Sequence, residues 1–160
     1  MTLMVEDGVK ISGCCESRLL IVGLGLIGGS LAAALRAAGF QGQIAACDPD
    51  DSEIARGIVM GLIDSGGTQL AEQVNDATMV VLAVPVLAME SVMASLAEAL
   101  PNASADVVIT DVGSTKATIR ACAQRVFGQV PTNMVLGHPI AGSEKSGVAA
   151  ANPRLYVDHK

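Results

Sequence analysis

Aromatic side chains and clusters of basic charge are what this sequence has least of. It contains no Trp, one Tyr and two Phe among 160 residues, although 51% of the residues are hydrophobic. The core must therefore be built from aliphatic side chains, which typically fill layers of helices and parallel strands. The net charge is −6 and no cluster of Lys or Arg occurs. This excludes the basic footprint expected of a nucleic-acid-binding protein.

Cysteine is also scarce, and its spacing excludes two further classes. Cys14, Cys15, Cys47 and Cys122 form neither a CxxC metal motif nor the dense framework of a small secreted fold. We therefore expect a reducing cytoplasm, no metal site, and Cys47 and Cys122 as small buried hydrophobic residues.

The length of the chain predicts a single domain. Residues 1–17 mix charges, Gly13 and the Cys14–Cys15 pair without a sustained period, so we expect a flexible N-terminal leader there. The domain itself is predicted to span residues 18–160.

The longest apolar stretch runs uncharged from Leu19 to Leu35, which is 17 residues. A membrane-spanning helix needs about 20 apolar residues, and four glycines would weaken this one. A secretory signal is the better competitor, with Lys10 and Arg18 as its basic region and residues 32–34 as its cleavage site. Acidic residues dilute that basic region, at Glu6, Asp7 and Glu16.

Apolar runs alternate with longer amphipathic or Ala-rich stretches along the chain, which is typical of an α/β fold with a parallel sheet. We predict strands at 18–23, 43–48, 78–85, 106–113 and 133–140, and helices at 29–38, 51–61, 89–100 and 114–128. A weaker signal suggests a strand within 61–67 and a short helix within 68–77. The helix at 89–100 carries one apolar stripe, formed by Met89, Val92, Met93, Leu96 and Leu100. The expected fold is a Rossmann-type, doubly wound, mainly parallel sheet with helices on both faces.

Gly23, Gly25 and Gly28 form a G-x-G-x-x-G motif between the first predicted strand and the following Ala-rich helix. The first glycine permits a tight turn, the second lets a pyrophosphate approach, and the third lets the helix lie close to the strand. A lone match is weak, but this one has the strand and helix that the motif requires. The cofactor-binding set therefore includes these glycines with Leu26 and Ile27, where a helix N-terminus attracts phosphate.

An acidic residue at the end of the second strand strengthens this interpretation. Asp48 lies about 20 residues after the glycines, where its carboxylate can accept hydrogen bonds from the ribose hydroxyls. A carboxylate there favours NAD over NADP, although Arg56 nearby keeps NADP possible. The alternative role for Asp48 is a helix N-cap or turn residue before Pro49. Val84 and Pro85 end the third strand and are predicted to line the crevice.

His138 ends a predicted strand inside a segment rich in small and polar residues, on the side of the sheet where ligands bind in such folds. A neutral imidazole can accept a proton from a hydroxyl as hydride leaves the same carbon. Ser114 ends the preceding strand and can hydrogen-bond that imidazole, or cap the next helix instead. Taken alone, a single histidine in an apolar context is more often a structural residue than a catalytic one. Lys116 is also consistent with a surface residue. Glu144 and Lys145 are consistent with either a solvated turn or substrate contacts.

The sequence resembles the prephenate and arogenate dehydrogenases of tyrosine biosynthesis over residues 18–160. The resemblance rests on "GLGLIGGSLA" at 23–32, "AVP" at 83–85, "TDVGSTK" at 110–116 and "GHPIAGSEKSG" at 137–147, the last being the most specific. It implies oxidative decarboxylation of prephenate or arogenate, with NAD accepting the hydride. His138 and Ser114 would be catalytic, and Ser143 and Glu144 would line the substrate pocket. We also place Asp111, in the third of these motifs, among the cofactor-binding residues.

Members of this family carry a second, mostly helical domain that completes the substrate site and forms a homodimer, and the sequence stops at Lys160. We therefore expect the cofactor-binding part of a longer enzyme, which binds NAD and a small-molecule substrate but neither nucleic acid nor membrane. Alone it should turn over prephenate poorly. The alternatives are another Rossmann dehydrogenase, such as a β-hydroxyacid dehydrogenase or a pyrroline carboxylate reductase, and a non-catalytic nucleotide-sensing domain.

Overall fold

The computed structural model describes residues 3–4, 10–11, 17–139 and 146–157. Its centre is a sheet of six parallel strands in the order β5-β4-β3-β6-β7-β8. The strands are β3 (Arg18–Val22), β4 (Gln43–Cys47), β5 (Ser65–Gly67), β6 (Met79–Leu82), β7 (Val108–Asp111) and β8 (Met134–Leu136). The chain adds β4 and β5 on one side of β3 and then crosses to add β6, β7 and β8 on the other side. This arrangement confirms the predicted Rossmann-type fold, in which ligands bind in the crevice where β3 and β6 end.

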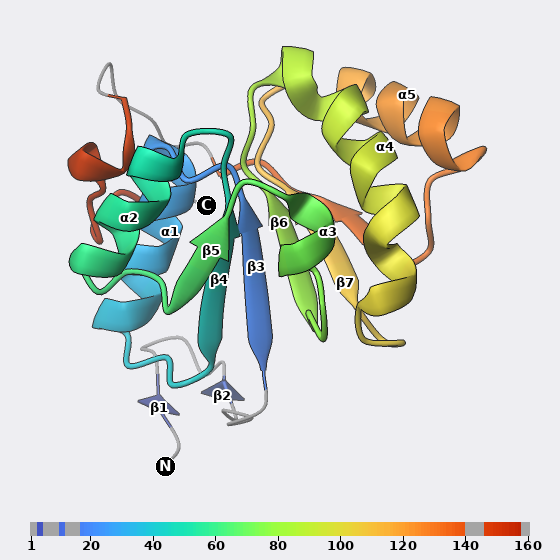
Figure 1. Ribbon diagram of the computed structural model, residues 1–160. Helices are drawn as coiled ribbons and strands as arrows, with labels where there is room; N and C mark the ends of the chain where they lie inside the picture. Colours follow the sequence, from blue (N-terminus) through green and yellow to red (C-terminus); the bar gives the residue numbers. More distant parts are fainter. Residues whose placement is uncertain (1–2, 5–9, 12–16, 140–145, 158–160) are drawn as a thin grey trace.

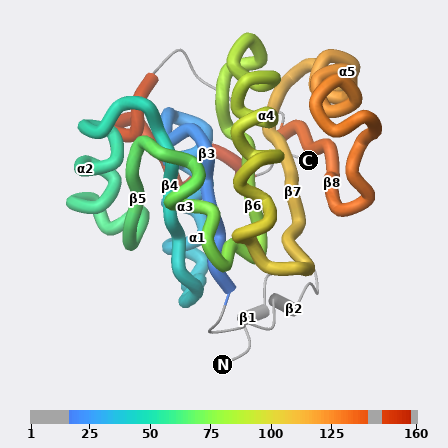
Figure 2. The backbone as a smooth tube through the Cα atoms, turned by 45° about the vertical axis from the view of Figure 1, so that its right-hand side comes forward, coloured from blue at the N-terminus to red at the C-terminus, as the bar shows by residue number. Residues whose placement is uncertain are grey.

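Helices cover both faces of the sheet, as Figures 1 and 2 show. On one face lie α1 (Leu26–Ala37) and α2 (Asp51–Val59), and on the other lie α3 (Leu70–Gln73), α4 (Met89–Ala99) and α5 (Lys116–Phe127). Short 3-10 turns follow β6 at η1 (Val86–Ala88) and α4 at η2 (Leu100–Asn102), and a third, η3 (Val148–Ala150), lies within residues 146–157.

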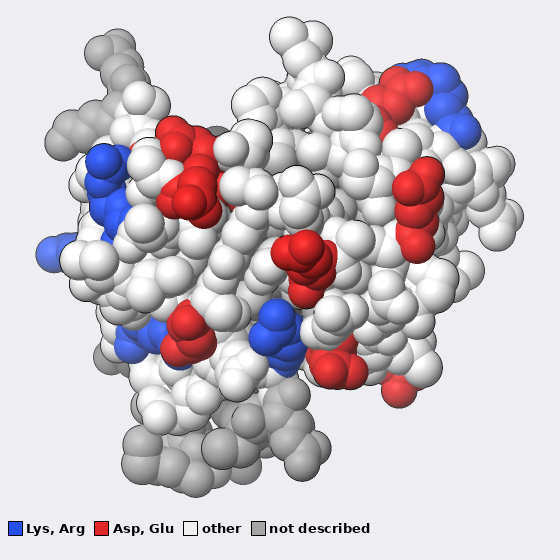
Figure 3. Space-filling view, viewed as in Figure 1, with Lys and Arg blue, Asp and Glu red and all other residues white. Residues whose placement is uncertain are grey.

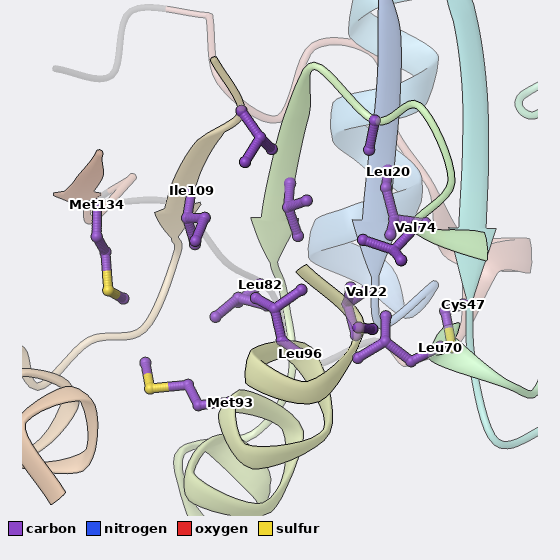
Figure 4. Close-up of a cluster of buried hydrophobic side chains, with 14 of the residues drawn as sticks. Leu20, Val22, Cys47, Leu70, Val74, Leu82, Met93, Leu96, Ile109 and Met134 are labelled. Atoms are coloured by element: carbon purple, nitrogen blue, oxygen red, sulfur yellow. The ribbon is translucent and has the colours of Figure 1, made fainter. Parts of the chain in front are cut away.

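Strand β3 shows why the opening of the domain is so apolar. Successive side chains of a strand point to opposite faces, so Leu20 and Val22 join the core under α3, α4 and α5, while Leu19 and Ile21 join the core under α1 and α2. All four are at most 5% exposed. The run from Leu19 is therefore a strand buried on both faces. Figure 4 shows the first of these cores, where Leu20, Leu82 and Ile109 of the sheet lie near Met93 and Leu96.

The predicted apolar stripe of α4 is confirmed. Met89, Met93 and Leu96 are fully buried against the sheet, and Val92 and Leu100 are partly buried beside them. The weaker prediction of a strand and a short helix is also confirmed. β5 and α3 lie within the predicted ranges, although each is shorter than its range.

Several boundaries differ from the prediction, and one strand pair was not predicted. Helix α1 begins at Leu26, three residues earlier than expected, so Gly28 lies inside its first turn. Strand β8 ends at Leu136 rather than at residue 140. Within the predicted leader, β1 (Leu3–Met4) pairs antiparallel with β2 (Lys10–Ile11), which sequence periodicity did not indicate. Each strand of that pair has only two residues, too few for an alternating pattern.

Residues 146–157 form a segment that we call the C-terminal strap. Val148 is fully buried in the core under α1 and α2, and its N–H group donates to the carboxylate of Glu53 on α2. The N–H group of Asn152 donates to the buried hydroxyl of Ser30 at 2.9 Å, and the Tyr156 hydroxyl donates to the carbonyl of Ile27 at 2.6 Å. The strap, red in Figure 1, thus lies against α1 and α2.

Among the described residues, no helix has both the length and the apolar character needed to cross a bilayer.

Candidate active site

The turn after β3 is held by Gly23. Its φ of +95° lies in the region that favours glycine, and a Cβ there would lie 2.5 Å from the carbonyl oxygen of Ala83. Its N–H group donates to the carbonyl of Cys47 at 2.8 Å. Gly23 therefore lets the chain turn between the ends of three neighbouring strands, β4, β3 and β6.

Gly25 and Gly28 occupy very different surroundings. Gly25 is the N-cap of α1, without a side-chain cap, and a Cβ built on it meets nothing within 4 Å. A Cβ on Gly28 would collide with the carbonyl oxygen of Gly23 and approach Ile21 to 2.9 Å. Because first-turn N–H groups have no partner within the helix, those of Leu26, Ile27 and Gly28 are available to an anion in the space beside Gly25.

Asp48 follows β4 at the same edge of the sheet and is half-buried. One carboxylate oxygen accepts from the N–H of Leu24 at 2.8 Å and the other from the N–H of Asp50 at 2.9 Å. Asp48 is not the N-cap of α2, because Asp50 holds that position and accepts from the N–H of Ser52. Since each carboxylate oxygen accepts more than one hydrogen bond, Asp48 can still bind ribose hydroxyls.

The charges around Asp48 are mainly negative. Asp50 and Asp51 are exposed at the start of α2, and Figure 3 shows acidic side chains gathered there. Hydrogen bonds from Ser52 hold the pKa of Asp50 below its usual value. Arg56 forms an ion pair with Glu53, with an N–O distance of 2.6 Å. The nearby cation is thus already paired with a carboxylate.

A cleft of about 660 Å³ opens beside these residues, between the strand ends and helices α3 and α4. Its lining includes Val22, Gly23, Cys47, Pro49 and Val84. Pro85 is exposed immediately after Val84 and is the N-cap of η1. Burial raises the pKa of the Cys47 thiol to about 11, so this thiol stays neutral near pH 7. Cys47 and Cys122 are both buried free thiols, as predicted.

His138 and Ser114 follow two neighbouring strands. His138 comes two residues after β8 and Ser114 three residues after β7, and these strands are parallel and paired through Asp111 and Leu136. The two side chains therefore lie at the same edge of the sheet, and both residues are exposed. In the described part of the chain, no hydrogen bond joins them. The N-cap of α5 is Thr115, so the alternative N-cap role for Ser114 is wrong.

Asp111, which we predicted among the cofactor-binding residues, is held by contacts within the chain. Its side chain is fully buried, and its oxygens accept hydrogen bonds from the backbone of Gly113 and Gly137 and an ion pair from Lys116. These contacts direct the carboxylate into the chain rather than towards the cleft. Lys116, for which a surface position was an open alternative, is 33% exposed and pairs with this buried carboxylate, which sequence spacing did not reveal. Ser143 and Glu144 lie outside the described residues.

Comparison with known proteins identifies the relatives of this domain. A family model described as prephenate dehydrogenase, nucleotide-binding domain, matches residues 31–160. The chain belongs to this family.

Several relatives of the chain are longer than it. Prephenate dehydrogenase of Bacillus subtilis is 37% identical over 142 residues, which cover 88% of this chain and 37% of that protein. The crystal structure of prephenate dehydrogenase from A. aeolicus with hydroxyphenyl propionate and NAD+ matches with a TM-score of 0.78 and 33% identity, covering 89% of this chain and 48% of that one. Synechocystis arogenate dehydrogenase matches with a TM-score of 0.75 and 28% identity, covering 89% and 48%. The chain thus spans half or less of each of these relatives.

Proposed function

We propose that this chain supplies the coenzyme-binding part of an NAD-dependent prephenate or arogenate dehydrogenase. The observation that carries the proposal is the placement of His138 and Ser114 at the sheet edge that also carries the glycine turn, in a chain of this family. The A. aeolicus relative, solved with NAD+ and hydroxyphenyl propionate, supports the same assignment. The whole enzyme would be a cytoplasmic homodimer acting on a small molecule, without binding nucleic acid or membrane.

The chain offers a fitting site for a dinucleotide. The space beside Gly25 admits a pyrophosphate to the first turn of α1, and Asp48 lies where ribose hydroxyls would be bound. When bound, NAD+ supplies the acceptor for a hydride. The substrate would lose a hydride and CO2, and its ring would become aromatic.

The residues of the chain handle the proton of this reaction. His138 would accept the proton of the substrate 4-hydroxyl while hydride leaves the same carbon, and would return it to that oxygen once CO2 has left and the ring is aromatic. Ser114, which follows the neighbouring strand, would orient the imidazole of His138 by hydrogen-bonding to it. Ser143 and Glu144 are proposed to line the substrate pocket. Because aromatisation drives the reaction, positioning is the main task of the protein.

The first experiment separates coenzyme binding from turnover. NAD should bind the 160-residue chain in a calorimetric titration, whereas prephenate-dependent NADH formation should require a chimera in which residues 18–160 replace the matching segment of the Bacillus subtilis relative. In that chimera, His138→Asn should lower kcat by about 100-fold or more, the usual contribution of a general base, with NAD affinity unchanged. Near-normal turnover of His138→Asn would remove this residue from the mechanism.

The same chimera tests the alternatives. NAD binding without turnover of either prephenate or arogenate would favour a nucleotide-sensing domain. Turnover of β-hydroxyacids instead would favour the other dehydrogenase class.

A second prediction concerns coenzyme choice. Asp48 and the acidic start of α2 should repel a 2′-phosphate, and Arg56 is already paired with Glu53. We expect the chain to bind NAD at least about tenfold more tightly than NADP, since like charges in contact cost several kcal/mol. Asp48→Asn should reduce this ratio while Asp76→Asn, distant in sequence and after α3, leaves it unchanged. Equal affinities for the two coenzymes in the unmodified chain would contradict the assignment.

A further inference from the structure

The carboxylate of Asp111 lies at the end of β7, beside the outermost strand β8, and does not line the cleft. It is only 1% exposed. One oxygen accepts from the N–H of Gly113 at 2.8 Å and the other from the N–H of Gly137 at 3.3 Å. A buried carboxylate is costly unless it is paired with a cation and hydrogen-bonded.

Lys116 is that cation, and its position in the helix is unusual. It is the first residue of α5, where the positive end of the helix dipole disfavours a positive side chain. Its ammonium group nevertheless forms an ion pair with Asp111 and also donates to the carbonyl of Gly137. The contacts with Asp111 and Gly137 explain a lysine at this place.

The pair joins the two loops that carry the candidate catalytic residues. Gly113 and Lys116, both bound to Asp111, flank Ser114 in the loop after β7. Gly137, bound through both its N–H and its carbonyl, immediately precedes His138. The neighbourhood is also tight, because a Cβ on Gly137 would lie 2.9 Å from the Asp111 carbonyl oxygen.

We propose that Asp111 and Lys116 are positioning residues that set the placement of His138 relative to Ser114. The proposal rests on the proposed function, because it concerns the geometry of the same proton-transfer pair. Neither residue needs to touch the substrate or the coenzyme. Their effect comes from fixing two loops that no strand pairing holds at this point, since β7 and β8 have ended.

The test uses two variants and a matched control. Lys116→Met keeps the length of the side chain but removes its charge, and Asp111→Asn with Lys116→Met removes both charges together. Arg125→Gln is the control. Arg125 also lies on α5, and its ion pair with Glu90 of α4, at 2.7 Å, is on the exposed surface. Amide hydrogen exchange at Gly113, Gly137 and His138 is measured by NMR in the 160-residue chain. The values of kcat, KM and NAD affinity are measured in the chimera.

Lys116→Met should speed amide exchange at Gly137 and His138 and lower kcat by about 100-fold, the cost of a misplacement of about 1 Å, while NAD affinity and KM for NAD hold. Where Lys116→Met alone fails to fold, the double variant decides, because replacing both charges removes the unpaired buried carboxylate. The double variant should recover thermal stability but not kcat. If the ion pair served only to stabilise the fold, kcat should recover together with stability.

Unchanged exchange at Gly137 and His138, or a normal kcat in the folded double variant, would overturn the positioning role. Failure of the unmodified chain to bind NAD would instead count against the proposed function. The exchange measurements remain informative in that case, because they need neither coenzyme nor turnover.

Discussion

At the scale of single residues, the glycines of the turn between β3 and α1 differ in what a side chain would meet. Gly28 has no space for a methyl group because the backbone of Gly23 lies against it, whereas Gly25 faces open space. A side chain at Gly28 would therefore disturb the packing of the chain itself. A side chain at Gly25 would instead occupy the space that we propose for the dinucleotide.

Alanine at these two positions should therefore give opposite results. Gly28→Ala should force α1 away from the turn and lower the free energy of unfolding by about 1–3 kcal/mol, the usual cost of overpacking. Gly25→Ala should cost less than about 1 kcal/mol, since its φ of −81° suits alanine and only the N-cap preference is lost. Its methyl group should nevertheless weaken NAD binding by occupying the space beside the first turn.

Urea unfolding and NAD titration of both variants measure the two effects separately. A stable Gly25→Ala variant with undiminished NAD affinity would show that the pyrophosphate does not approach at this residue. A fully stable Gly28→Ala variant would contradict the packing role.

Residues differ in how far sequence alone could place them. Asp48 was predictable, because a residue that ends the strand after a G-x-G-x-x-G turn returns to the same edge of the sheet, and the structure places it beside Leu24. The Asp111–Lys116 pair was not, since Lys116 also binds Gly137, 21 residues further along the chain. No local period or motif spacing encodes a contact between two loops. The most informative hint was a lysine at the start of a helix, where the dipole disfavours it.

At the scale of elements, burial decided which predictions were accurate. Strand β3 and helix α4 bury continuous or periodic apolar sets, so their patterns were strong. Strand β5 consists of Ser65, Gly66 and Gly67, which carry almost no apolar signal. It is a strand because its backbone pairs with β4, and that pairing is a tertiary property. The early start of α1 has a similar origin, since Gly25 and Gly28 are poor helix formers but the fold fixes their geometry.

At the scale of the whole molecule, the C-terminal strap connects distant parts of the chain. It returns from the β8 edge of the sheet to α1 and α2, which cover the opposite end, and closes one of the two cores with Val148. Tyr156 extends this contact to the first turn of α1, where its hydroxyl donates to Ile27. The glycine turn is therefore supported by residues more than a hundred positions away.

Tyr156 gives this contact a measurable dependence on pH. Burial raises the pKa of its phenol to about 12, whereas an unfolded chain ionises tyrosine near about 10. The folded state thus retains the proton that the unfolded state loses. The resulting stabilisation is fully present below about pH 10 and is lost as the pH rises through about 12. Tyr156→Phe should cost about 1 kcal/mol at neutral pH for the lost hydrogen bond, and the difference from the unmodified chain should shrink across this range.

The chain has one tyrosine and no tryptophan, so the ultraviolet absorbance of tyrosinate reports on Tyr156 alone. A pH titration of the folded chain should give a midpoint near 12, and the same chain in urea should give the ordinary value. Urea unfolding of Tyr156→Phe at several pH values isolates this group from the lysines and arginines that titrate in the same range. A folded-state midpoint near the unfolded one would mean that the strap does not bury the phenol against α1, because only removal from water and the bond to Ile27 distinguish the two states.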